Sequence, residues 1–248
     1  MRRCALPAPL DREKISLSSE TRRYLCQVLR LTAGTRFIGF DGAGFERIFE
    51  LAQEDGEHIA LGIEQVYQGT KGAPIGLIFA VPKGDKLDQV ARQITELGVS
   101  TLHLYSAERS VGIWKADKIK NKLARVERVS SEAARQSGRA DQLAIFPPKT
   151  LKELLFLYQD VPLKLYFDPE ASHGWPQNID AHIAQPQDSQ PLSCVMLIGP
   201  EGGLSPTEID LLKEAQWTGV RLQSPILRTE NAAVVACALA LDRLGYLA

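Results

Sequence analysis

The hydrophobic positions of this 248-residue chain follow one pattern before residue 70 and another after it. In the first part, residues 36–40 and 46–51 nearly alternate between apolar and polar side chains, and an Asp- and Gly-rich segment, residues 41–44, separates them. Alternation predicts half-buried strands, and Asp-Gly sequences favour hairpin turns. Residues 59–67 predict a further strand. Residues 1–70 are therefore predicted to form a small β-rich domain, resembling a barrel.

Beyond the polar, glycine-rich segment 69–74, the pattern predicts strands and helices in alternation. Residues 75–81 form a continuous apolar run, as expected of a strand buried on both faces. Apolar residues between positions 87 and 97 then recur at helical spacing, and Gly98 ends the helix. This alternation predicts an α/β domain with a mostly parallel sheet. Further strands are predicted at 101–105, 163–167 and 192–198, and a long basic helix at 118–137.

Charge is distributed unevenly along the chain, although the formal net charge is only −1. Residues 1–36 hold eight Lys and Arg against three Asp and Glu, and residues 109–139 hold nine against three. Residues 140–248 hold seven against thirteen. Clustered basic residues favour binding to a polyanion, because bound counterions are released. A solvated helix face is an equally good interpretation of the basic helix.

Composition and spacing exclude several classes of protein. The 44% hydrophobic and 24% charged content is typical of a soluble globular chain. Charged residues at 11–14 interrupt the apolar run that a signal peptide needs, and the longest apolar run, 232–241, is too short to span a bilayer. The four cysteines and four histidines have no zinc-ligand spacing. We therefore expect a cytoplasmic protein without a metal or disulfides.

A glycine-rich turn, residues 199–203, directly follows the predicted strand at 192–198. The next residues, 205–208, have the Ser-Pro-Thr-Glu sequence of a capping box with proline at the first helical position. Glycines let the backbone approach a ligand closely, at the edge where open α/β sheets bind ligands. The turn has neither the lysine of a P-loop nor the spacing of a dinucleotide-binding motif. A tight turn without a ligand remains the alternative interpretation.

A second turn, residues 222–231, precedes an alanine-rich helix near the C-terminus. It contains Arg228 and Glu230. An arginine stays charged and offers a planar fork of donors, and a carboxylate suits the start of a helix. On spacing alone, a local ion pair with a helix cap is the simpler interpretation of these two residues.

Together the two turns resemble those of the uridine-N3 16S ribosomal RNA methyltransferases of the α/β-knot (SPOUT) superfamily. Three further blocks occur in the family's order, and the resemblance covers essentially the whole chain. The chain departs from similar proteins at Gln223, where they usually have glycine, and at Pro225, near which they have arginine. The motifs are Gly199-Pro200-Glu201-Gly202-Gly203, Ile226-Leu227-Arg228-Thr229-Glu230, Thr95-Glu96-Leu97-Gly98-Val99, Glu108-Arg109-Ser110, and Glu132-Ala133 with Gln136 and Arg139.

The resemblance implies both a fold and a cofactor. It implies a PUA-like β-barrel RNA-binding domain over residues 1–70 and a SPOUT methyltransferase domain with a deep trefoil knot over residues 71–248. It also implies a homodimer that binds S-adenosylmethionine and acts on 16S ribosomal RNA of the small ribosomal subunit. The residues then expected at the cofactor are Phe167, Asp168, Ile198, Gly199, Pro200, Glu201, Gly202, Gly203, Leu222, Ser224, Ile226 and Leu227.

The chemistry of the implied reaction gives Arg228 and Glu230 catalytic roles. Uridine N3 carries a proton and is a poor nucleophile, so the site must favour proton loss and stabilise the resulting negative charge. We expect Arg228 to stabilise that charge. We expect Glu230 either to orient the Arg228 side chain or to accept the proton through water. Another knotted methyltransferase, acting on the ribose 2′-O, and a non-enzymatic RNA-binding assembly factor remain alternatives.

The residues expected to contact RNA lie in the two basic regions. Glu132, Gln136 and Arg139 have the spacing of one helix face, which could equally form a hydrogen-bonded strut at a dimer contact. Because base pairing hides N3, the target nucleotide must be reached in a loop or flipped out. The full set is Arg2, Arg3, Arg22, Arg23, Arg30, Arg109, Glu132, Gln136 and Arg139.

Overall fold

The chain divides into two compact units in the computed structural model, which describes residues 1–110, 112, 114, 116–172, 174 and 192–247. The first unit comprises Met1–Lys71 and Ala134–Gln142, and the second comprises Gly72–Ala133 and Leu143–Ala248. The local sequence pattern places a single boundary near residue 70 and does not predict the return of residues 134–142 to the first unit. Among the described residues, no helix is both long enough and apolar enough to cross a membrane.

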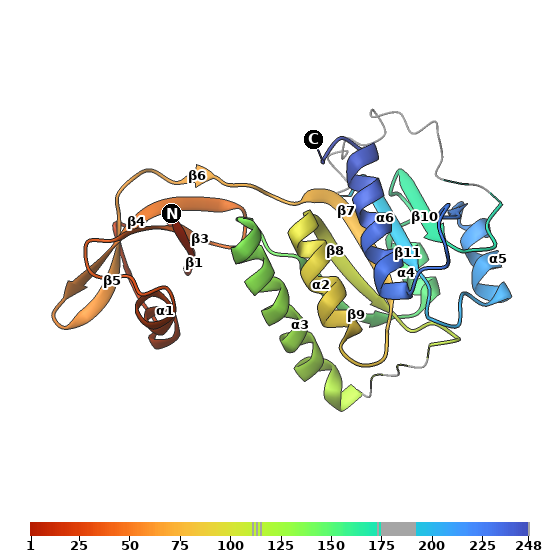
Figure 1. Cartoon of the computed structure of the whole chain (residues 1–248), viewed down its shortest axis with the longest axis horizontal. Coiled ribbons are helices and arrows are strands. Elements are labelled where there is room, and N and C mark those ends of the chain that lie inside the picture. The colour runs from red at the N-terminus through yellow and green to blue at the C-terminus, as the bar shows by residue number, and fades with distance from the viewer. Residues whose placement is uncertain (111, 113, 115, 173, 175–191, 248) are drawn as a thin grey trace. The chain divides into compact units, whose positions relative to one another are not determined.

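The first unit contains a mixed six-stranded sheet with the order β1-β3-β4-β5-β2, and β6 pairs with β4 (Figure 1). Strands β1 and β3 are parallel, and the other pairs are antiparallel. A short helix, α1, continues into a π-helical turn, η1. The elements are β1 (Arg2–Ala5), β2 (Lys14–Ser16), α1 (Ser19–Arg23), η1 (Tyr24–Val28), β3 (Arg36–Phe40), β4 (Phe45–Glu54), β5 (Glu57–Gly62) and β6 (Tyr67–Gln68).

The hairpin predicted around residues 41–44 is confirmed by β3 and β4. The Asp41 carboxylate accepts hydrogen bonds from the backbone N–H groups of Ala43 and Phe45, at 2.8 and 3.1 Å. Gly42 and Gly44 have φ values of 78° and 102°, which explains the need for glycine there. The single strand predicted at 59–67 is wrong, because β5 ends at residue 62 and β6 begins only at residue 67.

The second unit contains a six-stranded sheet with the order β12-β10-β11-β7-β8-β9, and every pair in it is parallel. The prediction of a mostly parallel α/β domain is therefore confirmed. The local pattern predicted neither β9 nor the short β12. Strand β9 contains two prolines, which a strand tolerates when it lies at the edge of a sheet. The elements are β7 (Ala73–Ala80), α2 (Lys86–Leu97), β8 (Val99–Tyr105), α3 (Ala116–Ser137), β9 (Ala144–Lys149), α4 (Leu151–Leu157), β10 (Leu163–Phe167), β11 (Cys194–Ile198), α5 (Pro206–Glu214), β12 (Thr218–Val220) and α6 (Thr229–Arg243).

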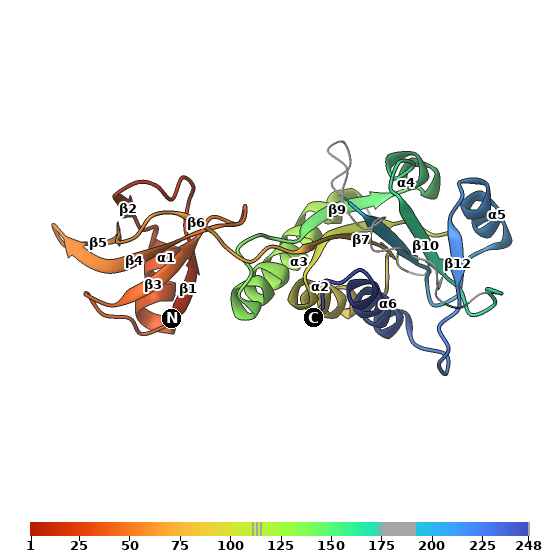
Figure 2. The same cartoon turned by 90° about the horizontal axis from the view of Figure 1, so that it is seen from above.

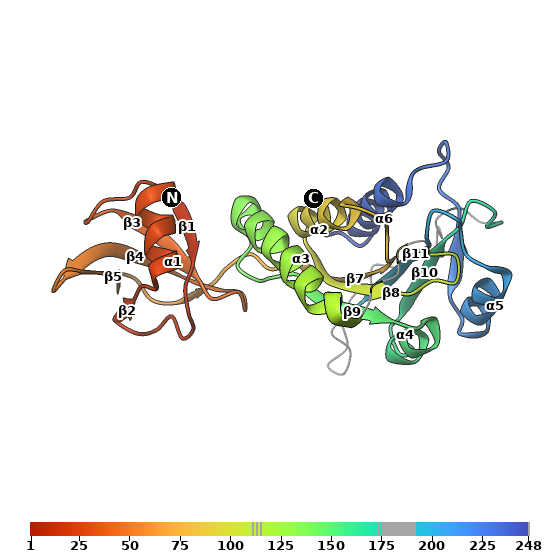
Figure 3. The same ribbon diagram turned by 90° about the horizontal axis from the view of Figure 1, so that it is seen from below.

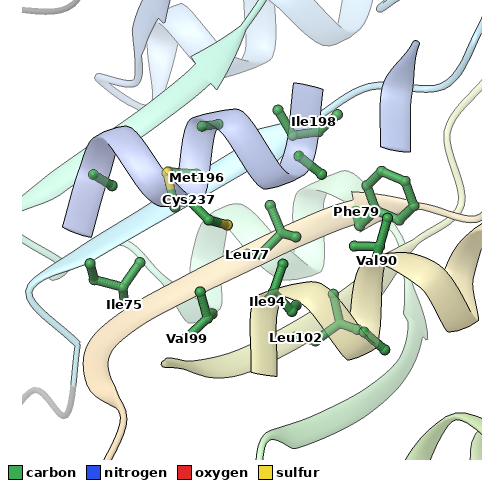
Figure 4. Packing of buried hydrophobic residues seen from close by; sticks show 14 of the residues in the cluster. Ile75, Leu77, Phe79, Val90, Ile94, Val99, Leu102, Met196, Ile198 and Cys237 are labelled. Atoms are coloured by element: carbon green, nitrogen blue, oxygen red, sulfur yellow. The ribbon is translucent and has the colours of Figure 1, made fainter. Parts of the chain in front are cut away.

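Helices cover both faces of the parallel sheet, with α2 and α6 on one face and α4 and α5 on the other (Figures 2 and 3). Helix α6 packs against α2, β7 and β11 through small, fully buried side chains, among them Ala236 and Cys237. Figure 4 shows Cys237 and the α2 residues Val90 and Ile94 against the sheet. Small residues let α6 lie close to the strands, which brings its first turn to the ends of β10 and β11.

Three neighbouring strands end at the same level of the sheet. In the parallel register, Phe167 of β10 pairs with Ile198 of β11 on one side and with Val220 of β12 on the other. The segments that follow these three residues therefore leave the sheet at a common edge. Both turns singled out in the sequence, at 199–203 and 222–231, follow these strand ends.

Candidate active site

A pocket of about 330 Å³ lies at the carboxyl ends of β10, β11 and β12. The glycine-rich turn forms one wall, the second turn forms another, and residues 167–170 close a third side. All twelve residues expected at a cofactor line this pocket except Gly202, which lies against Arg109. The remaining lining residues are Pro169, Glu170, Leu204, Val220, Arg221, Pro225, Thr229 and Ala232.

The glycine-rich turn is fixed at both of its ends. Its backbone closes through a 2.9 Å hydrogen bond from Gly203 N–H to the Pro200 carbonyl, and Gly203 has a φ of 72°. The predicted capping box of α5 is present: Ser205 Oγ accepts from Glu208 N–H at 3.1 Å, and Glu208 Oε2 accepts from Ser205 N–H at 2.8 Å. The start of α5 thus determines where the turn ends.

The loop after β8 holds the glycine-rich turn from outside. Arg109 donates from Nη1 to the carbonyls of Gly202 and Leu204, at 3.4 and 3.2 Å. The buried Glu208 carboxylate reaches the same loop, where Oε1 accepts from Glu108 N–H at 3.0 Å, and it also accepts at 3.4 Å from the hydroxyl of Tyr105, the last residue of β8. Arg109, predicted from the sequence to contact RNA, therefore clamps the turn in this structure.

The second turn leads directly into α6, whose N-cap is Arg228. The Arg228 backbone is extended, and its side chain makes no capping hydrogen bond. The Arg228 side chain is exposed, and within the described part of the chain no hydrogen bond or ion pair involves its guanidinium. The local ion pair with Glu230, which was the simpler interpretation of the sequence, is therefore wrong.

Glu230 instead pairs with Lys86, a residue that the sequence analysis did not single out. Glu230 is 6% exposed, and its Oε2 lies 3.2 Å from Lys86 Nζ. Lys86 also donates to Glu201 Oε1 at 3.0 Å. Burial raises the pKa of Glu230, but its own backbone N–H and the Lys86 ammonium outweigh that effect, so the pKa is lowered overall. One feature of the sequence could have identified Lys86: it is a cation in the first turn of a predicted helix, where the helix dipole disfavours a positive charge.

Two of the arginines predicted to bind RNA are structural in the first unit. Arg139 is 3% exposed and forms hydrogen bonds to both carboxylate oxygens of Asp141, at 2.9 and 3.1 Å. Arg3 pairs with the buried Glu46 and donates to the Arg139 carbonyl. Arg139 also lies beyond the end of α3 at Ser137, so its predicted place on one helix face with Glu132 and Gln136 is wrong. We therefore leave Arg3 and Arg139 out of the candidate RNA surface.

The other arginines of the first unit that were predicted to bind RNA are exposed, and two of them line a hollow. Arg2, Arg22, Arg23 and Arg30 are exposed. Arg22 and Arg23 line a hollow of about 400 Å³ together with Ser19, Cys26, Gln27, Gly56 and His58. Two guanidinium groups beside one open hollow offer a positive surface to an anion. Glu132 and Gln136 are also exposed, on α3.

Comparisons with known proteins agree on one family. Residues 70–241 match an RNA methyltransferase domain, and residues 17–64 match an RNA methyltransferase PUA domain. Ribosomal RNA small subunit methyltransferase E of Bacillus subtilis is 28% identical over 89% of this chain and 87% of its own length. The enzyme of the same name from Synechocystis is 30% identical over 94% of this chain and 74% of its own length. A Legionella pneumophila methyltransferase solved with bound S-adenosylmethionine superposes with a TM-score of 0.83, at 25% identity over 97% of both chains.

Proposed function

The chain belongs to the RNA methyltransferase family that includes the ribosomal RNA small subunit methyltransferases E, and we propose that it methylates uridine N3 of 16S ribosomal RNA with S-adenosylmethionine as donor. One observation carries this proposal. The glycine-rich turn and the second turn, both predicted from the sequence to bind the donor, line one pocket at the strand ends. The match of the chain to this family confirms the resemblance stated from its motifs.

The charges of the pocket suit this donor. The pocket lining contains three acidic residues, Asp168, Glu170 and Glu201, and one basic residue, Arg221, while Glu201 is also paired with Lys86. S-adenosylmethionine, when bound, supplies an electrophilic methyl group on a positively charged sulfur. An acidic pocket stabilises that positive charge. The apolar wall formed by Ile198, Leu222 and Leu227 suits the adenine ring, while the glycines leave room for backbone contacts.

The residues beside the pocket suit the removal of the N3 proton. Glu230 is held as a carboxylate by its backbone N–H and by Lys86, so it can accept a proton directly or through water. Arg228 precedes it at the start of α6, with an exposed guanidinium that makes no hydrogen bond or ion pair with the residues the structure describes. We propose that Arg228 stabilises the negative charge that spreads over the uracil carbonyl oxygens.

The remaining parts of the proposal concern the partners. We propose that the chain acts in the cytoplasm as a homodimer, that the second unit carries the trefoil knot of its superfamily, and that residues 1–70 bind RNA. In the first unit, Arg2, Arg22, Arg23 and Arg30 present exposed guanidinium groups to RNA phosphates. Exposed Glu132 and Gln136 remain proposed contacts of the target nucleotide.

The function is tested by incubating the protein with labelled S-adenosylmethionine and small ribosomal subunits that lack the modification. We expect label in 3-methyluridine of 16S ribosomal RNA, identified by mass spectrometry of the nucleosides. Label in a 2′-O-methylated nucleoside would support the ribose enzyme instead. Binding of RNA without any methyl transfer would contradict the proposed activity.

Binding of the protein to a 16S ribosomal RNA fragment is expected to weaken steeply with added salt. Each phosphate contact contributes roughly 0.7 to 0.9 to the slope of log affinity against log salt, so replacing Arg22 and Arg23 together with alanine should lower that slope by about 1.5. Fluorescence anisotropy at several salt concentrations measures this change. The matched control is Arg12→Ala, which removes an exposed arginine of the same unit outside the hollow. Equal slopes for the three proteins would exclude the hollow as a phosphate site.

A further inference from the structure

Lys86 connects three segments that are far apart in the sequence. It is the first residue of α2, and its ammonium contacts Glu201 of the glycine-rich turn and Glu230 of α6, at 3.0 and 3.2 Å. We infer that Lys86 is a positioning residue for methyl transfer, whose ammonium holds the glycine-rich turn and the first turn of α6 together at the pocket. This inference rests on the proposed function, because it gives Glu230 a role in that reaction.

The position of Lys86 is unfavourable for the helix that carries it. The first turn of a helix is its positive end, where an acidic residue is stabilising and a cation is not. The other two charged residues there, Asp85 and Asp88, follow the usual preference and pair with Arg125, at 2.8 and 2.6 Å. Lys86 therefore gains its favourable interactions from outside α2, namely from the two glutamates at the pocket.

The ion pair between Lys86 and Glu201 is too exposed to matter much for folding. The Lys86 side chain is 30% exposed and that of Glu201 is 35% exposed, and partly exposed ion pairs contribute little to stability. The pair with the buried Glu230 acts at the site itself, because both carboxylates bond to one ammonium and so lie close together. Two neighbouring carboxylates without a cation repel each other, and one of them then takes up a proton more easily.

Glu230 is the carboxylate whose protonation matters for the proposed reaction. Among the described residues, the charged group that pairs with its carboxylate is Lys86 of α2, which also pairs with Glu201 of the glycine-rich turn. Arg228, which precedes it by two residues, is exposed and makes no ion pair with it. Without Lys86, Glu230 loses the cation that lowers its pKa, so its pKa rises. A larger fraction of the enzyme would then hold Glu230 protonated and unable to accept the N3 proton.

The test compares Lys86→Met, Lys86→Arg and the control Lys83→Met, which removes an exposed cation three residues earlier. Single-turnover methyl transfer to small ribosomal subunits is measured between pH 6 and 9, and the affinity for S-adenosylmethionine is measured by calorimetry. Dividing each variant's rate by the wild-type rate at the same pH cancels the ionisation of the uridine itself. We expect Lys86→Met to be several-fold slower than the wild type at pH 6 and its deficit to narrow as the pH rises.

The other variants separate a positioning role from a structural one. Lys86→Arg keeps the charge and should recover most of the rate, Lys83→Met should match the wild type, and all variants should bind the donor within about threefold. A Lys86→Met enzyme with the wild-type rate and pH profile overturns the inference, as does a loss that is the same at every pH. If Lys86→Met does not fold, Lys86→Gln replaces it with the same two outcomes.

Failure of the inference can be told apart from failure of the proposed function. If the wild type transfers no methyl group to uridine N3, the proposed function fails before Lys86 is considered. If the wild type is active and Glu230→Gln keeps its full rate, the role of Glu230 fails, and with it the reason for the pH-dependent effect of Lys86.

Discussion

Replacing Arg228 with alanine is expected to lower the rate of methyl transfer by about 10²- to 10³-fold, the range found when a donor to a developing negative charge is removed. The guanidinium makes no hydrogen bond or ion pair within the described residues, and it does not line the pocket. Folding and donor binding should therefore be unaffected. Single-turnover transfer to small ribosomal subunits, with calorimetric titration of S-adenosylmethionine, measures both effects.

Two further variants show whether the loss of rate is specific to position 228 and whether it depends on the planar shape of the guanidinium. Arg243→Ala removes an exposed arginine from the other end of α6 and should leave the rate unchanged. Arg228→Lys keeps the positive charge but not the planar fork of donors, so an intermediate rate is expected. Near-normal turnover of Arg228→Ala would remove this residue from the mechanism.

Replacing Glu208 with alanine is expected to destabilise the second unit by about 3 kcal/mol, because buried donors lose their acceptor and the capping box of α5 loses its carboxylate half. The carboxylate is 2% exposed and accepts hydrogen bonds from the backbone N–H groups of Ser205 and Glu108 and from the Tyr105 hydroxyl. Removing it leaves two backbone N–H groups without their acceptor. Denaturant unfolding followed by circular dichroism measures the change.

The chain contains a matched control for this substitution. Thr150 and Glu153 form a second capping box at the start of α4, but Glu153 is exposed, and among the described residues its carboxylate bonds only within the box and to Lys149. Glu153→Ala should therefore lower the unfolding midpoint much less than Glu208→Ala. Equal effects would mean that the contacts of Glu208 with the loop after β8 add nothing to the cap.

Local chemistry determines the features that the sequence predicted correctly. The apolar run at 75–81, the helical spacing that stops at Gly98 and the strand at 163–167 each depend on neighbours within a few residues, and the structure confirms each of them. The capping box after the glycine-rich turn is equally local. Hydrophobic periodicity and cap residues act over such short ranges, so they can be read from the chain directly.

The missed elements lacked a strong local signal. Strand β9 contains Pro147 and Pro148, which argue against a strand unless it lies at a sheet edge, and the sequence does not say which strand that will be. The single strand predicted at 59–67 was wrong for a related reason, since β5 and β6 pair with different parts of β4. The strands with which β5, β6 and β9 pair, and not their local sequences, therefore set where these strands begin and end.

The sequence by itself determined the two turns, the alternation of strands and helices, and the family to which they belong. Only the tertiary structure decided that β12, β10 and β11 are neighbours, which joins the turns around one pocket. It also decided that Glu230 pairs with Lys86, more than a hundred residues away, and that Arg139 is buried beside Asp141. The physical reason is range: periodicity and caps depend on adjacent residues, whereas strand order, ion pairs and burial depend on which distant segments meet.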